Sequence, residues 1–121
     1  MLAQPPRLRR IVRSFGYAFE GLALMLRSQP NFLIHLLAAA LAVLIGLILH
    51  LNPVEFAILV LTIGLVLVTE CVNTVLETVC DLVSPGYHPL VKRAKDISAA
   101  AVLVAAAASV VIAVLLYVPH L

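Results

Sequence analysis

The chain has 121 residues and a formal net charge of +2, with 64% hydrophobic and only 12% charged residues. This length suits one domain, residues 1–121, but a mean hydropathy of +1.15 lies far outside the range of soluble domains. The composition therefore excludes a soluble globular protein and predicts an integral membrane protein.

The basic residues are confined to two segments. All eight Lys and Arg residues lie within residues 7–27, before the first long apolar run, or within residues 92–95, between the second run and the third. Because basic loops stay on the cytoplasmic side of a membrane, we expect both segments to face the cytoplasm. Residues 1–6 (MLAQPP) lack the pattern of a signal peptide, so we expect the N-terminus to be retained and cytoplasmic.

The first predicted element is a basic amphipathic helix over residues 6–28. Its apolar residues recur every three or four positions, and arginines occupy the opposite side. A helix of this kind lies in the membrane interface. Two interpretations of its arginines remain open: they anchor the helix to anionic headgroups, or they contribute to a functional site. Residues 28–31 (SQPN) end the pattern, and Pro30 begins a new element.

The first predicted membrane span covers residues 32–51. About twenty apolar residues cross a hydrocarbon core of about 30 Å. His35 lies near the start of this span and His50 near its far end. At both positions we favour an interfacial histidine with a satisfied partner over a metal ligand. Asn52, Pro53 and Glu55 then predict a capped helix start, so Glu55 needs no catalytic role.

The second predicted span, residues 54–83, is longer than a membrane requires and should project from it on the cytoplasmic side. Its projecting half carries Glu70 followed by Asn73, Glu77 and Asp81 at spacings of three, seven and eleven. These four side chains fall within an arc of about 80° and form a polar stripe about 16 Å long. Cys71 and Cys80, nine positions apart on the same helix, point to different sides and are expected to be buried, unbridged thiols.

A third span is predicted over residues 90–118. Residues 84–86 (SPG) end the second helix, and residues 87–89 (YHP) begin the next, whose first turns carry Lys92, Arg93, Lys95 and Asp96. Alanines on the apolar part that follows allow neighbouring helices to approach closely. The expected fold is therefore an all-α membrane protein with one surface helix and three transmembrane helices, its N-terminus inside and its C-terminus outside.

Three interpretations of the polar stripe follow from the residues. An acidic side chain at membrane depth costs about 2.5 to 3.5 kcal/mol. In the first, contacts between copies of the chain seal the stripe, and its outer acids pair with lysines or Arg93 of the third helix. In the second, the chain is a subunit of a small proton-coupled transporter, although no polar group continues the stripe between Thr62 and Glu55.

The third interpretation is a phosphoryl-transfer site at the membrane interface. Such a site needs a carboxylate for Mg²⁺, cations for phosphate, and a base for the attacking hydroxyl. Glu77 can hold the metal, Lys95 and Arg10 can meet phosphate, and Glu70, the deepest acid, can take the proton. The chain has no Gly-rich phosphate loop, which excludes a nucleotide kinase of conventional fold.

Several motifs resemble those of the prokaryotic diacylglycerol kinase family, which includes the undecaprenol kinases. The motifs extend over nearly the whole chain and are Arg10, Gly16-Tyr17, Gly21, Asn31-Phe32-x-x-His35, Glu70-x-x-Asn73-Thr74-x-x-Glu77-x-x-x-Asp81, Tyr87-His88-Pro89-Leu90 and Ala94-Lys95-Asp96. The resemblance implies a homotrimer in a bacterial inner membrane, with composite sites on the cytoplasmic side that transfer the γ-phosphate of MgATP to a lipid hydroxyl.

The resemblance also implies a role for each matching residue. Glu70 is the proton acceptor, Asn73 supports the reacting groups, and Glu77 binds the metal of the nucleotide. Around ATP it places Arg10, Tyr17, Gly86, Tyr87, His88, Lys95 and Asp96.

Two positions depart from the family pattern. Gln29 stands where an acid often helps to hold the metal, and its amide offers an oxygen without a charge, which shifts the metal towards Glu77 and Asp81. Ala99 replaces a residue that can be polar near the lipid. The motifs around His35 and His88 favour undecaprenol slightly over diacylglycerol as the substrate. The expected partners are ATP, Mg²⁺, a lipid alcohol, the bilayer and further copies of the chain, without nucleic acid.

Overall fold

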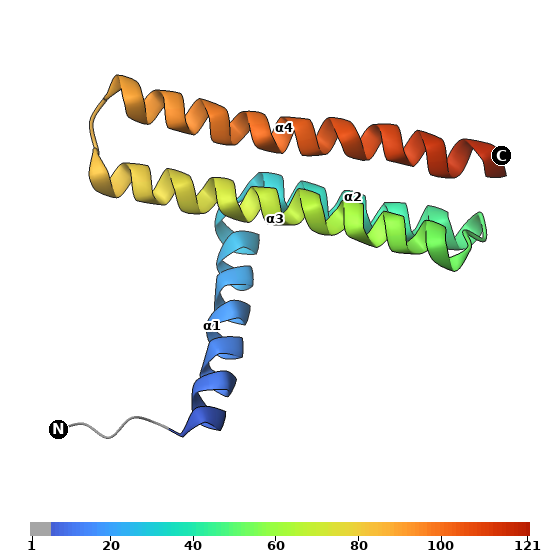
Figure 1. Ribbon diagram of the computed structural model, residues 1–121, viewed down its shortest axis with the longest axis horizontal. Helices are drawn as coiled ribbons and strands as arrows, with labels where there is room; N and C mark the ends of the chain where they lie inside the picture. The colour runs from blue at the N-terminus through green and yellow to red at the C-terminus, as the bar shows by residue number, and fades with distance from the viewer. Residues whose placement is uncertain (1–5) are drawn as a thin grey trace.

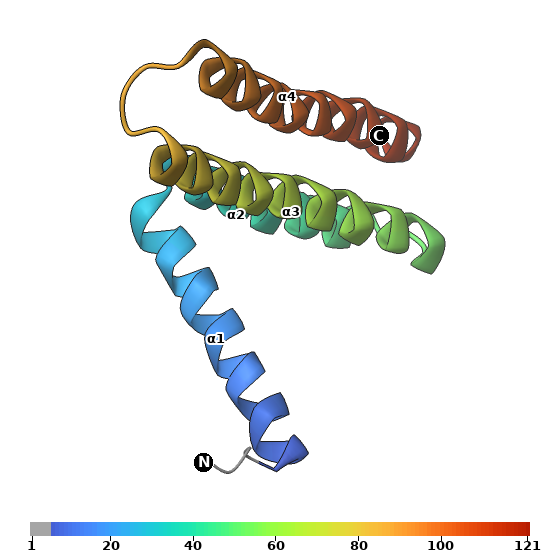
Figure 2. The same ribbon diagram turned by 60° about the vertical axis from the view of Figure 1, so that its left-hand side comes forward.

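The computed structural model describes residues 6–121, and the predicted cytoplasmic segment 1–5 lies outside the described residues. The elements are α1 (Arg7–Ser28), α2 (Pro30–Ile48), α3 (Pro53–Val83), α4 (Pro89–Tyr117) and a short 3₁₀ helix, η1 (Val118–His120). Helices α2, α3 and α4 run side by side, and α1 leaves them at a steep angle (Figures 1 and 2). This arrangement confirms the predicted all-α fold with one separate amphipathic helix.

Three of the described helices, α2, α3 and the segment from Pro89 to His120, are long and apolar enough to cross a membrane. Helix α3 has 31 residues, which corresponds to about 46 Å and exceeds a hydrocarbon core of about 30 Å. Its final turns extend past the start of α2 on the side where α1 departs (Figure 1). This end of the bundle, with the α3–α4 connection, is called the loop end below.

Helix α1 is exposed along its length except near its junction with α2. Among its residues only Met25 is buried. A single residue, Gln29, separates the two helices, and its backbone bonds into both of them. Its N–H donates to the Met25 carbonyl at 3.0 Å, and its own carbonyl accepts from the Phe32 N–H at 3.1 Å. An amphipathic helix projecting from an apolar bundle can lie along the membrane surface, as the sequence predicts.

The turn between α2 and α3 has the predicted capping box. The Asn52 side chain accepts from the Glu55 N–H at 2.9 Å, and the Asn52 N–H donates to the Glu55 carboxylate at 3.1 Å. His50 takes a left-handed conformation, with φ of 55°, which reverses the chain before the cap. Glu55 also lies 2.8 Å from His120, so its contacts are structural, in agreement with the sequence interpretation.

The small core lies at the end of the bundle opposite the loop end. Leu51, Leu59 and Leu116 are buried together, and the Tyr117 hydroxyl donates to the Ala42 carbonyl at 2.8 Å, which ties α4 to α2. A Cβ atom added to Gly46 would lie 3.1 Å from the Leu51 side chain, so glycine permits this close approach. Most large apolar side chains point outward, as expected of helices that face lipid or other copies of the chain.

Candidate active site

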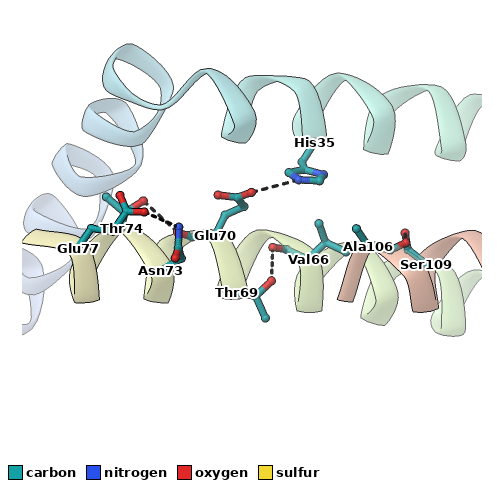
Figure 3. A network of polar contacts seen from close by, with 9 residues as sticks. All are labelled: His35, Val66, Thr69, Glu70, Asn73, Thr74, Glu77, Ala106 and Ser109. Carbon is teal, nitrogen blue, oxygen red and sulfur yellow. Dashed lines mark hydrogen bonds and ion pairs between the residues drawn. The ribbon is translucent and has the colours of Figure 1, made fainter. Parts of the chain in front are cut away.

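Glu70 occupies the deep end of the polar stripe and points inward. Its side chain is 5% exposed, and its Oε1 lies 3.1 Å from Nε2 of His35 on α2 (Figure 3). Helix α3 presents the carboxylate, and α2, antiparallel to it across the short turn, brings the imidazole opposite. His35 therefore has a partner, in line with the satisfied histidine that the sequence favours.

Asn73 and Glu77 follow Glu70 towards the loop end, one and two turns further along α3. The Asn73 amide donates to Glu77 Oε1 at 3.3 Å (Figure 3). The Thr74 hydroxyl donates to the Glu70 carbonyl at 3.0 Å and so keeps its polar atom within the helix. Asn73 Oδ1 is buried and has no partner among the described residues. Because unpaired buried acceptors are uncommon in native proteins, this oxygen is available to a group outside the described chain.

Asp81, the last member of the stripe, faces α4. Its carboxylate lies 2.6 Å from Nζ of Lys95, and its side chain is 64% exposed. This contact realises the sequence alternative in which an outer acid of the stripe pairs with a lysine. Asp96, another predicted ATP residue, pairs with Lys92 at 2.6 Å one turn earlier on the same helix.

The α3–α4 connection contains three of the predicted ATP residues. Gly86, Tyr87 and His88 are exposed, and the Ser84 hydroxyl donates to the Gly86 carbonyl at 3.2 Å. His88 also has a role that sequence reasoning missed. Its Nδ1 accepts from the Leu90 N–H at 3.1 Å and caps α4. Its place directly before Pro89, the first residue of a helix, is the signal that could have revealed this cap.

The two predicted ATP residues of the surface helix stay apart from the stripe. Arg10 and Tyr17 are exposed on α1, which points away from α3 and α4 (Figure 2). The described part of one copy therefore brings Glu70 to His35, Asn73 to Glu77 and Asp81 to Lys95, but it does not bring Arg10 or Tyr17 to the carboxylates. The composite sites that the family resemblance implies predict such a separation within one copy.

The residues fit a metal that arrives with a nucleotide better than a resident ion. Among residues 6–121 no group of three His, Cys, Asp or Glu side chains can hold a metal. Mg²⁺ in phosphate chemistry is held by one or two carboxylates together with substrate phosphates. Glu77 supplies one carboxylate, and the unpaired Asn73 Oδ1 adds a neutral oxygen one turn away.

Helix register brings Gln29 to the same level as Glu77. Gln29 precedes His35 by six residues, and Glu77 follows Glu70 by seven residues on the antiparallel neighbour. At about 1.5 Å per residue, both lie about 10 Å from the His35–Glu70 contact, in the same direction. This count gives the depth of each residue along the bundle and not the side of the helix on which it lies.

A cavity of about 180 Å³ lies between α2, α3 and α4 and begins beside His35. Its α2 wall is formed by Ala38, Ala39 and Ala42, and its floor includes Thr62 on α3. Sequence analysis did not predict this cavity, although the small residues at spacings of one and four along α2 were a signal for it. The imidazole of His35 separates the cavity from Glu70.

Comparisons with known proteins show the family of the chain. The sequence pattern of the family described as Prokaryotic diacylglycerol kinase matches residues 16–117. The chain is 42% identical to a diacylglycerol kinase of Synechocystis over 89% of this chain and 62% of that relative. It is 37% identical to the undecaprenol kinase of Bacillus subtilis over 94% of this chain and 93% of the relative. A diacylglycerol kinase of Escherichia coli is 33% identical over 84% of each chain.

The family match includes Glu70, Asn73 and Glu77, the α3–α4 connection and the first turns of α4. The chain therefore belongs to the prokaryotic diacylglycerol kinase family.

Proposed function

We propose that the chain is a bacterial membrane lipid kinase that transfers the γ-phosphate of MgATP to the hydroxyl of a lipid alcohol at the cytoplasmic face of the inner membrane. Its N-terminus is then inside and its C-terminus outside, because both basic segments face the cytoplasm. The observation that carries the proposal is Glu70, a carboxylate 5% exposed inside an apolar bundle, one turn from an amide with an unpaired oxygen. Family membership supports the same activity.

Glu70 is the proton acceptor in this mechanism. A general base must lie within hydrogen-bond reach of the proton it takes, and Glu70 presents its carboxylate at the deep end of the stripe. The lipid oxygen attacks the γ-phosphorus, the bond from that phosphorus to ADP breaks, and the hydroxyl proton passes to Glu70. Asn73 lies between Glu70 and Glu77, where its amide N–H holds Glu77 and its free Oδ1 remains available to the metal of the nucleotide.

Glu77 and Gln29 hold the nucleotide at the loop end of the site. One oxygen of Glu77 is fixed by Asn73 at 3.3 Å, which leaves the other for a divalent ion. A bound Mg²⁺ neutralises phosphate charge during transfer. Since Gln29 adds no charge, the binding of the metal depends mainly on Glu77.

The remaining ATP contacts come from the exposed residues of α1, the α3–α4 connection and α4. Lys95 can turn from Asp81 to phosphate because exposed ion pairs are weak. Arg10 and Tyr17 lie on a helix that leaves its own bundle, so a neighbouring copy is the natural source of these side chains. A homotrimer with composite sites satisfies this requirement.

Undecaprenol is the proposed acceptor. The relative named undecaprenol kinase matches over nearly its entire length, and the sequence around His35 and His88 favours the same substrate. Diacylglycerol is the alternative acceptor, because relatives named diacylglycerol kinase match the chain as well. No feature of the family or the described fold favours the proton-coupled transporter.

The decisive experiment incubates the purified protein in detergent micelles with γ-labelled ATP and undecaprenol, diacylglycerol or no lipid. Label in undecaprenol is expected. Label in diacylglycerol alone would overturn the proposed acceptor and leave the kinase intact. Label in neither lipid would overturn the kinase itself.

A further inference from the structure

The carboxylate that accepts the proton has a side-chain partner to which neither the sequence analysis nor the proposed function gives a role. His35 lies 35 residues before Glu70 and on a different helix. The two side chains approach to 3.1 Å, and the imidazole is 24% exposed whereas the carboxylate is 5% exposed (Figure 3).

The contact answers a physical need of Glu70. Burying a carboxylate is costly unless another group offers it a polar contact in place of water. Among the described residues, His35 is the one cationic or ring-nitrogen side chain within 4.0 Å of this carboxylate. An imidazole stabilises a carboxylate through the N–H dipole when neutral and through its full charge when protonated.

The same contact restricts where the carboxylate can point. His35 approaches Oε1, so the other oxygen, Oε2, is left for a reacting group. The imidazole also lines the cavity between α2, α3 and α4, whereas Glu70 does not. A lipid hydroxyl can therefore meet the carboxylate from the side of Asn73, away from the imidazole.

We propose that His35 is a positioning residue of the kinase, which holds Glu70 Oε1 so that Oε2 is aimed at the lipid hydroxyl. The hydroxyl proton goes to Oε2, and His35 neither gains nor loses a proton in the transfer. The inference rests on the proposed function, because it assigns His35 a task only if Glu70 is the base.

The test compares two substitutions of the same residue. His35→Leu keeps a similar size but removes every polar contact, so it should lower kcat about 100-fold, the loss expected when a reacting group is misplaced by about 1 Å. His35→Gln keeps an N–H donor at a similar reach and should recover activity to within about fivefold of the original protein. The KM for ATP should stay within twofold in both, because His35 lies about 10 Å from Glu77.

The matched control is His50→Asn, which removes the other imidazole of the α2–α3 hairpin. His50 has φ of 55°, and Asn tolerates that conformation. This variant should keep the original kcat. If His35→Leu also keeps kcat within twofold, or if His35→Gln is as impaired as His35→Leu, the positioning role is wrong.

A second measurement separates this role from a general structural one. In thermal unfolding, His35→Leu should destabilise the original protein, because it leaves the buried Glu70 carboxylate without its partner. The same substitution should not destabilise the Glu70→Gln variant, which holds a neutral amide at that position. Equal destabilisation in both backgrounds would show that His35 does not act through Glu70. If the original protein labels no lipid, the proposed function fails. If the protein is an active kinase but His35→Leu destabilises both backgrounds equally, only the role of His35 is overturned.

Discussion

The two ends of the polar stripe on α3 make similar contacts in different surroundings. Glu70 lies 3.1 Å from His35 with 5% of its side chain exposed, and Asp81 lies 2.6 Å from Lys95 with 64% exposed. Solvent screens the exposed Asp81–Lys95 pair, whereas the buried carboxylate of Glu70 meets its partner with little solvent around it. Burial, and not distance, therefore distinguishes the acid suited to proton transfer from the acid that is replaceable.

The largest effect is expected at the buried end. Glu70→Gln should lower kcat by at least about 1,000-fold, because the amide keeps the shape of the side chain and cannot accept a proton. Lipid phosphorylation measures the loss, and size-exclusion chromatography and nucleotide binding should be unchanged. A variant that retained most of its kcat would remove Glu70 from the role of base and end the contrast between the two ends.

Glu77, between the two ends, should affect the nucleotide more than the chemical step. Glu77→Ala removes the carboxylate that Asn73 holds, so KM for MgATP should rise about 10- to 100-fold, with partial recovery at higher Mg²⁺ or with Mn²⁺. Titrations of each ion at fixed ATP test this. If recovery does not depend on the divalent ion, Glu77 is not a metal ligand.

A substitution of Gln29 tests whether metal binding can be strengthened. Gln29→Glu restores a charge that family members often carry, and it should lower the Mg²⁺ concentration for half-maximal activity several-fold, about 1 kcal/mol of added metal binding. Gln29→Ala is the matched control and should shift that concentration upward. An unchanged or opposite shift for Gln29→Glu would place the metal away from the α1–α2 junction.

The smallest effect is expected at the exposed end. Asp81→Asn frees Lys95 for phosphate, so KM for ATP should fall or stay within about threefold, with kcat and the thermal midpoint nearly unchanged, because exposed ion pairs contribute little. Lys92 and Asp96 form a matched exposed pair on α4, and Lys92→Gln serves as the control. A collapse of kcat in Asp81→Asn would show that both ends of the stripe are equally essential.

The sequence predicted the helices and the stripe because their signals are local. Helical periodicity places Glu70, Asn73 and Glu77 on one side of α3, and Asn52 with Glu55 forms a cap within four residues. His35 and Glu70 are 35 residues apart in the sequence. Their contact depends on how α2 packs on α3, which no local pattern specifies. The cap that His88 provides was missed because a family motif had already assigned that residue to ATP.

Gln29 has a further consequence through its position as the single residue between α1 and α2. Its backbone bonds into both helices, so the surface helix and the first span meet in an elbow of one residue. His35 lies six residues below that elbow, or about 9 Å along the helix. With α1 along the membrane surface, as its amphipathic pattern predicts, this short link would fix the depth of Glu70 relative to that surface.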